Sequence, residues 1–171
     1  MRTRANVALS VLAAALAVVL FAVVLPAHGD RAAVAKQAFT GDERAAMNPA
    51  SVEAVNLLSY RRAHFEADFS RALAGATGNL KKDLAGERSA TLQAMQKNKI
   101  DLAANLQASA VVPSPAGKPA GSSIPVLVVV TGSTVDDTGK STPTKVERVL
   151  VTMVRSGTKW LASGIQVTEG A

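Results

Sequence analysis

The two halves of the chain repeat their apolar residues with different periods, and this change constrains the fold more than any other feature. From Ser51 to Asn98, apolar residues recur at the three- and four-residue spacing of amphipathic helices. From Ile100 to Val167, the apolar segments alternate or run continuously, as strands do. Segregated helices and strands favour an α+β domain in which helices cover one face of a curved antiparallel sheet. The sequence therefore predicts two long helices followed by about four strands.

Each predicted helix carries one apolar stripe. We expect the first to begin at Ser51, after the start signal of Pro49 and with Ser51 or Asn48 as N-cap, and to end near Gly75 or Gly78. The second runs from about Asn79 to Asn98. The residues expected to face inward are Val55, Leu58, Phe65, Phe69 and Leu73 in the first helix, and Leu80, Leu84, Thr91, Leu92 and Met95 in the second.

The strands are separated by turn signals. We expect strands over Ile100–Val112, Ile124–Ser133, Lys145–Arg155 and Trp160–Val167. A Pro/Gly-rich connection over Pro113–Ser123, a long hairpin loop over Val135–Thr144 and a tight turn over Ser156–Lys159 separate them. The second strand is apolar on both faces, which predicts a central position in the sheet.

The third predicted strand is also apolar on both faces. Val149, Val151 and Met153 share one face, and Val146, Leu150 and Val154 share the other with Arg148 and Thr152. Two apolar faces indicate either a sheet that its own helices cover on one side and another protein covers on the other, or a central strand of a small twisted sheet.

Trp160 follows a glycine turn and allows two interpretations. We expect it to be buried against the first helix near Phe65 and Phe69; in the alternative it is exposed and anchors a partner.

An apolar run from Val7 to Leu25 carries no charge and is long enough to span a bilayer as a helix. We expect a retained anchor with Arg2 and Arg4 in the cytoplasm and the following domain on the extracytoplasmic side. The alternative is a secretory signal cleaved before Asp30, after Ala27-His28-Gly29. The predicted organisation is a tip and anchor over residues 1–29, a stalk over 30–50 and an α+β domain over 51–171.

Composition excludes several functions. The chain has no cysteine, so a disulfide framework, a thiolate nucleophile and a Cys-ligated metal site are excluded. Its formal net charge is +6, but the basic residues are mixed with acidic ones and accompanied by few aromatics, which argues against a nucleic-acid surface. No Gly-rich phosphate loop, Gly-x-Ser-x-Gly elbow or His-Glu-x-x-His pattern occurs.

Three residues are the best candidates for proton transfer. Tyr60, His64 and Asp68 are each four residues from the next, so one helix face would carry all three. Enzymes on cone-shaped rolls use such groups for general acid–base work. The alternative that we favour is a structural His64–Asp68 pair with Tyr60 packed at a rim.

The remaining candidates for metal binding are weak. His28 is the only other histidine and lies beside the apolar run, which argues against a two-histidine metal site. Asp136, Asp137 and Gly139 are similar to part of a calcium loop, but the regular ligand spacing and closing glutamate are missing, so we interpret them as a hairpin tip. We therefore expect no catalytic, cofactor or metal site.

Three segments and the apolar run resemble the Mce-associated membrane proteins that accompany mammalian-cell-entry (Mce) lipid importers in actinobacteria. They are Leu57–Asp68 (LLSYRRAHFEAD), followed by Gly78-Asn79-Leu80, and Val151–Ile165 (VTMVRSGTKWLASGI), in which a Gly-x-x-Trp turn leads into the last strand. The same ending occurs across the cystatin-like roll superfamily, which includes SnoaL-like cyclases and ketosteroid isomerases. The insert over Pro113–Ser123 departs from the family pattern.

The resemblance implies a non-catalytic accessory subunit that supports assembly or stability of a lipid importer, and it transfers no catalytic residue. Its expected partners are the membrane and protein subunits of the transporter. The alternatives are a binding protein for a small apolar molecule, a SnoaL-like enzyme that uses the cone, and a cleaved secreted protein.

Overall fold

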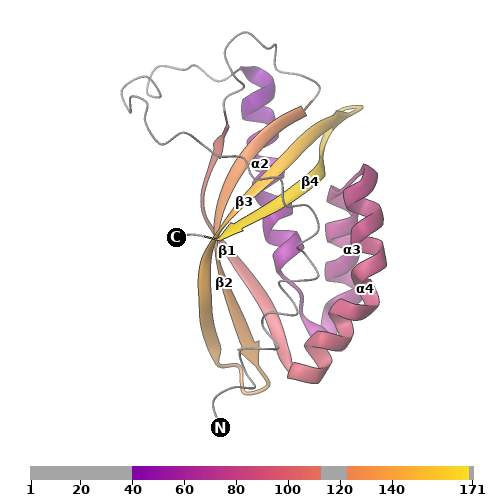
Figure 1. Cartoon of the computed structure of the whole chain (residues 1–171), viewed down its shortest axis with the longest axis vertical. Coiled ribbons are helices and arrows are strands. Elements are labelled where there is room, and N and C mark those ends of the chain that lie inside the picture. Colours follow the sequence, from indigo (N-terminus) through magenta and orange to yellow (C-terminus); the bar gives the residue numbers. More distant parts are fainter. Residues whose placement is uncertain (1–39, 113–122, 170–171) are drawn as a thin grey trace. The chain divides into compact units, whose positions relative to one another are not determined.

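The computed structural model describes residues 40–112 and 123–169, in which helices precede strands as predicted (Figure 1). The elements are α2 (Gly41–Leu58), a 3₁₀ turn η2 (Arg62–His64), α3 (Phe65–Gly75), α4 (Gly78–Asn98), β1 (Ile100–Val111), β2 (Ser123–Asp136), β3 (Ser141–Ser156) and β4 (Lys159–Glu169). The α+β class is therefore confirmed.

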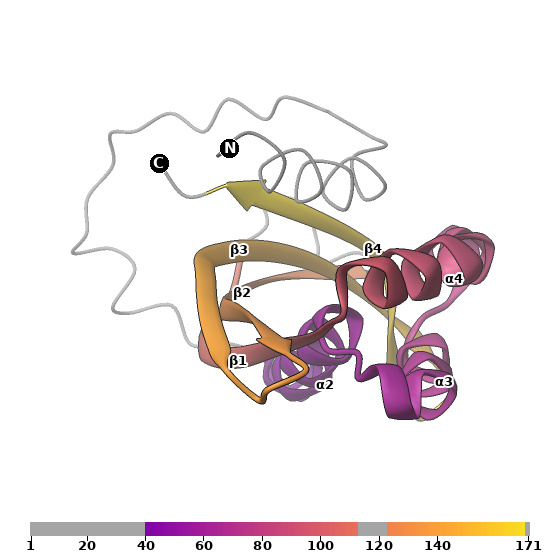
Figure 2. The same ribbon diagram turned by 90° about the horizontal axis from the view of Figure 1, so that it is seen from below.

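The described strands form one antiparallel sheet in the order β1-β2-β3-β4, which confirms that β2 is central. The sheet curves around α2, and α3 and α4 lie side by side beyond it (Figure 2). Strand residues of one parity point toward the helices and are almost completely buried. They are Ile124, Val126, Val128 and Val130 of β2 and Val149, Val151 and Met153 of β3.

The described core has two clusters of buried apolar side chains. The larger joins α2 to the sheet through Ala46, Ala50 and Ala54, whose small side chains bring the helix close to the strands. The smaller, here called the aromatic cluster, contains Leu57, Tyr60, Phe65, Phe69, Ala72 and Met95. It fastens α3 and the last part of α4 to the end of α2.

The first helix begins at Gly41, so the predicted start at Ser51 was wrong. Thr40 Oγ1 accepts a hydrogen bond from the Glu43 backbone N–H at 3.2 Å, and the Thr40 N–H donates to Glu43 Oε2 at 2.7 Å. This reciprocal capping box starts the helix, and Pro49 lies inside it. Residues 41–50 of the predicted stalk therefore form the first half of α2.

The prediction of one continuous helix from Ser51 to Gly75 was also wrong, because the chain leaves the helix after Leu58. The Tyr60 N–H donates to Leu102 O at 2.9 Å, and the Leu102 N–H donates to Tyr60 O at 2.8 Å. Ser59 Oγ accepts from the Ala104 N–H at 3.0 Å. Residues 59–60 are thus a short extended segment at the outer edge of β1, which separates α2 from α3.

The β2–β3 connection is a tight turn at residues 137–140, not the predicted loop over Val135–Thr144. Asp136 Oδ1 accepts hydrogen bonds from the Thr138 N–H, the Thr138 hydroxyl and the Lys140 N–H. Gly139 adopts φ +79°, which glycine permits. The interpretation of these residues as a hairpin tip is confirmed.

Trp160 is half-buried and packs against the larger cluster, not against Phe65 and Phe69 as predicted. It lies opposite Arg155 in the β3–β4 pair, at the start of the last strand. The second helix, the first strand and the final turn have bounds close to those predicted.

Several predictions fall on residues that the structure does not describe. They are the membrane span over 7–25, the cleavage site before Asp30, His28 and the connection over 113–122. Among the described residues, no helix has both the length and the apolar character of a membrane span.

Candidate functional site

The extended segment after α2 separates the three residues predicted to share one helix face. Tyr60 lies in that segment, His64 ends the 3₁₀ turn and Asp68 lies in α3. The predicted proton-transfer face is therefore absent, and the alternative His64–Asp68 pair is absent as well, because Asp68 is bound to arginines.

Asp68 is 3% exposed and makes ionic contacts with two arginines. Its Oδ2 accepts from the Arg61 N–H at 3.0 Å and from Arg61 Nε at 2.9 Å, and its Oδ1 accepts from Arg61 Nη2 at 2.7 Å and from Arg71 Nη2. The hydrogen bonds from Arg61 are the main reason that the pKa of Asp68 lies far below its usual range. A carboxylate held in this way is a poor proton acceptor, and its structural role is to fix the start of the 3₁₀ turn.

Tyr60 is buried in the aromatic cluster. Its ring centroid lies 5.8 Å from that of Phe65 and 6.0 Å from that of Phe69. Burial, and then the charges of Glu53 and Asp68, raise the pKa of its hydroxyl well above the usual value. The phenol therefore stays protonated at neutral pH, and the ring contributes packing.

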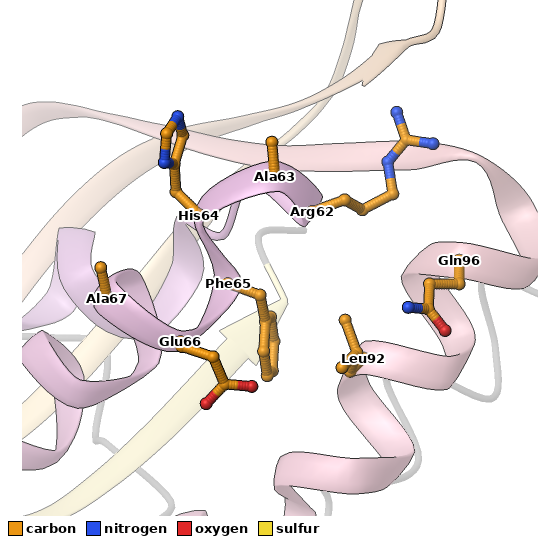
Figure 3. Close-up of a pocket in the computed structure, with 8 residues that line it drawn as sticks. All are labelled: Arg62, Ala63, His64, Phe65, Glu66, Ala67, Leu92 and Gln96. Atoms are coloured by element: carbon orange, nitrogen blue, oxygen red, sulfur yellow. The ribbon is translucent and has the colours of Figure 1, made fainter.

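His64 is exposed beside a groove of about 330 Å³ between the start of α3 and α4. Figure 3 shows its ring directed away from Leu92 and Gln96, which lie on the other side of the groove. Glu66 in the groove accepts a hydrogen bond from Arg88 Nε at 3.1 Å and is paired with it. The groove therefore brings no acid–base pair together.

Arg62 joins three parts of the fold. Its N–H and Nε donate to Asp101 Oδ1 of β1 at 3.0 and 2.8 Å, and its Nη2 lies 2.7 Å from Asp137 Oδ1 at the hairpin tip. Both aspartates of the predicted hairpin tip thus have structural roles, Asp136 within the turn and Asp137 in this ion pair.

Glu53 is the functional candidate that the sequence analysis missed. It lies on the inner face of α2, is 3% exposed, and its Oε1 has no hydrogen-bond partner among the described residues. Burial raises its pKa to about 7. The sequence does contain a pattern that indicates its burial, because Glu53 lies on the same helical stripe as Ala46, Ala50, Ala54 and Leu57.

The side of the sheet away from the helices is a second candidate site, here called the outer sheet face and defined by Leu127, Val129, Leu150, Val154 and Leu161. All five are half-buried and belong to neither described core cluster. Cross-strand partners share a face, and Leu127 lies opposite Leu150, and Val154 opposite Leu161. The second apolar face predicted for β3 therefore extends over β2, β3 and β4, with Arg148 and Thr152 on the same face.

Neither protein-family models nor curated protein sequences match the chain. Solved structures do match. The periplasmic domain of DotI gives a TM-score of 0.61 at 15% identity, covering 79% of this chain and 99% of that one. A periplasmic fragment of TraM gives 0.59 at 12% identity, with 78% and 100% covered. CagV of Helicobacter pylori, described as a VirB8 homologue of a type IV secretion system, gives 0.53 at 10% identity, with 76% and 98% covered.

These matches assign the fold, which is an α+β roll like that of the DotI, TraM and CagV structures. At such low identity they assign nothing else to this chain. The roll expected from the resemblance is confirmed, whereas membership of the Mce-associated family stays a proposal.

Proposed function

We propose that this protein is a non-catalytic, single-pass accessory subunit that supports the assembly or stability of a multi-protein membrane complex through its extracytoplasmic domain. The observation that carries the proposal is the outer sheet face. Five apolar side chains on three strands face away from the protein's own helices, and apolar side chains grouped on one sheet face are typical of a protein-binding site.

The apolar run over Val7–Leu25 supports attachment to a membrane. We propose a cytoplasmic tip and anchor over 1–29, a connecting segment beginning at residue 30, and an extracytoplasmic domain. The similar DotI and TraM structures are of a periplasmic domain and a periplasmic fragment, which supports the same side of the membrane for this domain.

The complex that we propose is an Mce-type lipid importer. The resemblance of Leu57–Asp68 and Val151–Ile165 to Mce-associated proteins supports this choice. The rival is a secretion-type assembly, favoured by the likeness to CagV, a VirB8 homologue of a type IV secretion system. Both are multi-subunit membrane complexes, so both require a protein-binding surface.

The site chemistry supports a non-catalytic role. Asp68 is held by Arg61 and Arg71, the Tyr60 hydroxyl stays protonated and His64 is exposed and separate from both. The alternative function, binding or conversion of an apolar small molecule in the cone, requires a deep cavity. The buried side chains of the two described clusters pack between the helices and the sheet, which argues against such a cavity.

Co-purification with an acidic double variant tests the proposal. Leu127→Glu combined with Leu150→Glu places two charges on the outer sheet face without touching either core cluster. We expect recovery of partner subunits from native membranes in mild detergent to fall at least about tenfold, because charges at the centre of an apolar interface are strongly unfavourable. Quantitative mass spectrometry of the tagged protein's companions measures this.

The matched control is Ala85→Glu with Ser89→Glu, which adds the same charge to the exposed side of α4. It should leave partner recovery unchanged. Mce subunits among the companions would support the importer, and secretion-system subunits would favour the rival. Equal recovery with both double variants would contradict a role for the outer sheet face.

A further inference from the structure

The Glu53 carboxyl lies against the end of α3, at the point where the chain turns toward β4. A Cβ atom built on Gly75 would lie 1.8 Å from Glu53 Oε2, so only a glycine leaves room for the carboxyl there. Gly75 is the last residue of α3. The carboxyl therefore lies against the negative end of the helix dipole, a position that disfavours its ionised form.

The residues that follow Gly75 cover part of the outer edge of β4. Ala76 forms a parallel bridge with Ala162, and the Thr77 N–H donates to Ala162 O at 2.8 Å. Ala76 is 2% exposed and Ala162 is fully buried. Gly75, which contacts Glu53, is thus adjacent in sequence to Ala76, which covers the edge of β4.

Among the described residues, no cation is paired with Glu53. Tyr60 is the titratable group linked electrostatically to Glu53. Asp68 acts on Tyr60 as well, and it is paired with Arg61 and Arg71. Asn56 is the polar group on α2 that forms a hydrogen bond with the carboxyl. The neighbouring parts of α4 and β4 contribute the apolar side chains of Leu80, Leu84 and Ile165 to the adjoining clusters.

We propose that Glu53 is a proton-controlled latch: its neutral form holds Gly75–Thr77 against β4, and its ionisation releases this segment and uncovers the β4 edge at Ala162. The carboxyl loses its proton to solvent, and the charged group then needs water that the closed position excludes. Since Oε1 has no hydrogen-bond partner among the described residues, the hydrogen bond with Asn56 offsets only part of this cost, and burial outweighs it. Movement of Gly75 away from Glu53 lets water reach the carboxylate.

The sign and size of the effect follow from proton linkage. The pKa of Glu53 is about 7 in the closed state and close to its ordinary 4.5 once hydrated. Below pH 4.5 Glu53 is protonated in both the closed and the open state. Between pH 4.5 and about pH 7, ionisation of Glu53 favours the open state. The opening constant should therefore rise about thirtyfold from pH 5.5 to pH 8 and level off above pH 7.

Hydrogen exchange of the full chain in detergent tests the latch. The Thr77 amide, which donates to Ala162 O in the closed state, should show the thirtyfold rise in opening after correction for its intrinsic exchange rate. Glu53→Gln should abolish it, and Gly75→Ala should give high exchange at both pH values because its Cβ displaces the carboxyl. Glu87→Gln, an exposed carboxyl on α4, should keep the wild-type profile and serves as the control.

Two outcomes would overturn the proposal. One is a flat wild-type profile between pH 5.5 and pH 8, which needs no variant to be informative. The other is a rise that persists in Glu53→Gln, because that variant retains His64 and every other titratable group.

Discussion

Replacing Asp68 with asparagine is expected to lower the free energy of unfolding by about 2–4 kcal/mol, because hydrogen bonds to a buried charge are strong. The carboxylate of Asp68 is buried, and it accepts from the Arg61 backbone, the Arg61 side chain and Arg71. These contacts hold the chain where it leaves the extended segment and enters the 3₁₀ turn. Asparagine keeps the size of the side chain but loses its charge.

Denaturant unfolding measures this loss, with the chain's single tryptophan, Trp160, as the fluorescent probe. Glu66→Gln is the control, because Glu66 pairs with Arg88 on the exposed surface and should contribute at most about 0.5 kcal/mol. If the two variants lost similar amounts of stability, the structural role given to Asp68 would be wrong.

The Asp68 variant should also change the acid sensitivity of the fold. The folded-state pKa of Asp68 lies below its unfolded value, so its stabilising contribution is complete above the unfolded pKa and is lost as the pH falls toward the folded one. Below about pH 4 the wild type should therefore lose this contribution, and Asp68→Asn should show a smaller acid-dependent loss.

Replacing Phe69 with alanine is expected to cost about 3–5 kcal/mol, the range for a large aromatic side chain removed from a core. Phe69 is 3% exposed, and its ring lies 5.4 Å from that of Phe65 and 6.0 Å from that of Tyr60, measured between centroids. It therefore joins α3 to the segment that follows α2. The cavity would loosen both, together with Met95 of α4.

The same unfolding measurement with Ser70→Ala, an exposed neighbour on α3, provides the control for Phe69. That control should change stability by no more than about 0.5 kcal/mol. A loss below 1 kcal/mol in Phe69→Ala would mean that the aromatic cluster does not hold α3 in place.

Periodicity predicted the order of helices and strands because it reports which face of each element is buried. It placed α4, β1 and the central strand β2 nearly correctly. It did not predict the break after Leu58, because the backbone pairing of Tyr60 with Leu102 depends on a strand distant in the sequence. The four-residue spacing across that break therefore predicted that Tyr60, His64 and Asp68 share one helix face, whereas the fold separates them.

The sequence also indicates the start of α2 and the burial of Glu53, but other patterns in the sequence favoured different interpretations. The capping box of Thr40 and Glu43 marks the true start of α2, but Pro49 favoured a later start. Glu53 lies on the same helical face as Ala50 and Leu57, which predicts burial of a carboxyl. Its position against Gly75 depends on how α2 and α3 pack, and helical spacing alone does not contain that information.

The proposed function requires the outer sheet face to contact another protein of a membrane complex. Site-specific photo-crosslinking in living cells tests it most directly, with the photoreactive residue at position 150 in that face and at position 89 on exposed α4 as the control. We expect a discrete crosslinked product with a different protein from position 150 and none from position 89. Absence of a product from position 150, or the same product from both positions, would contradict it.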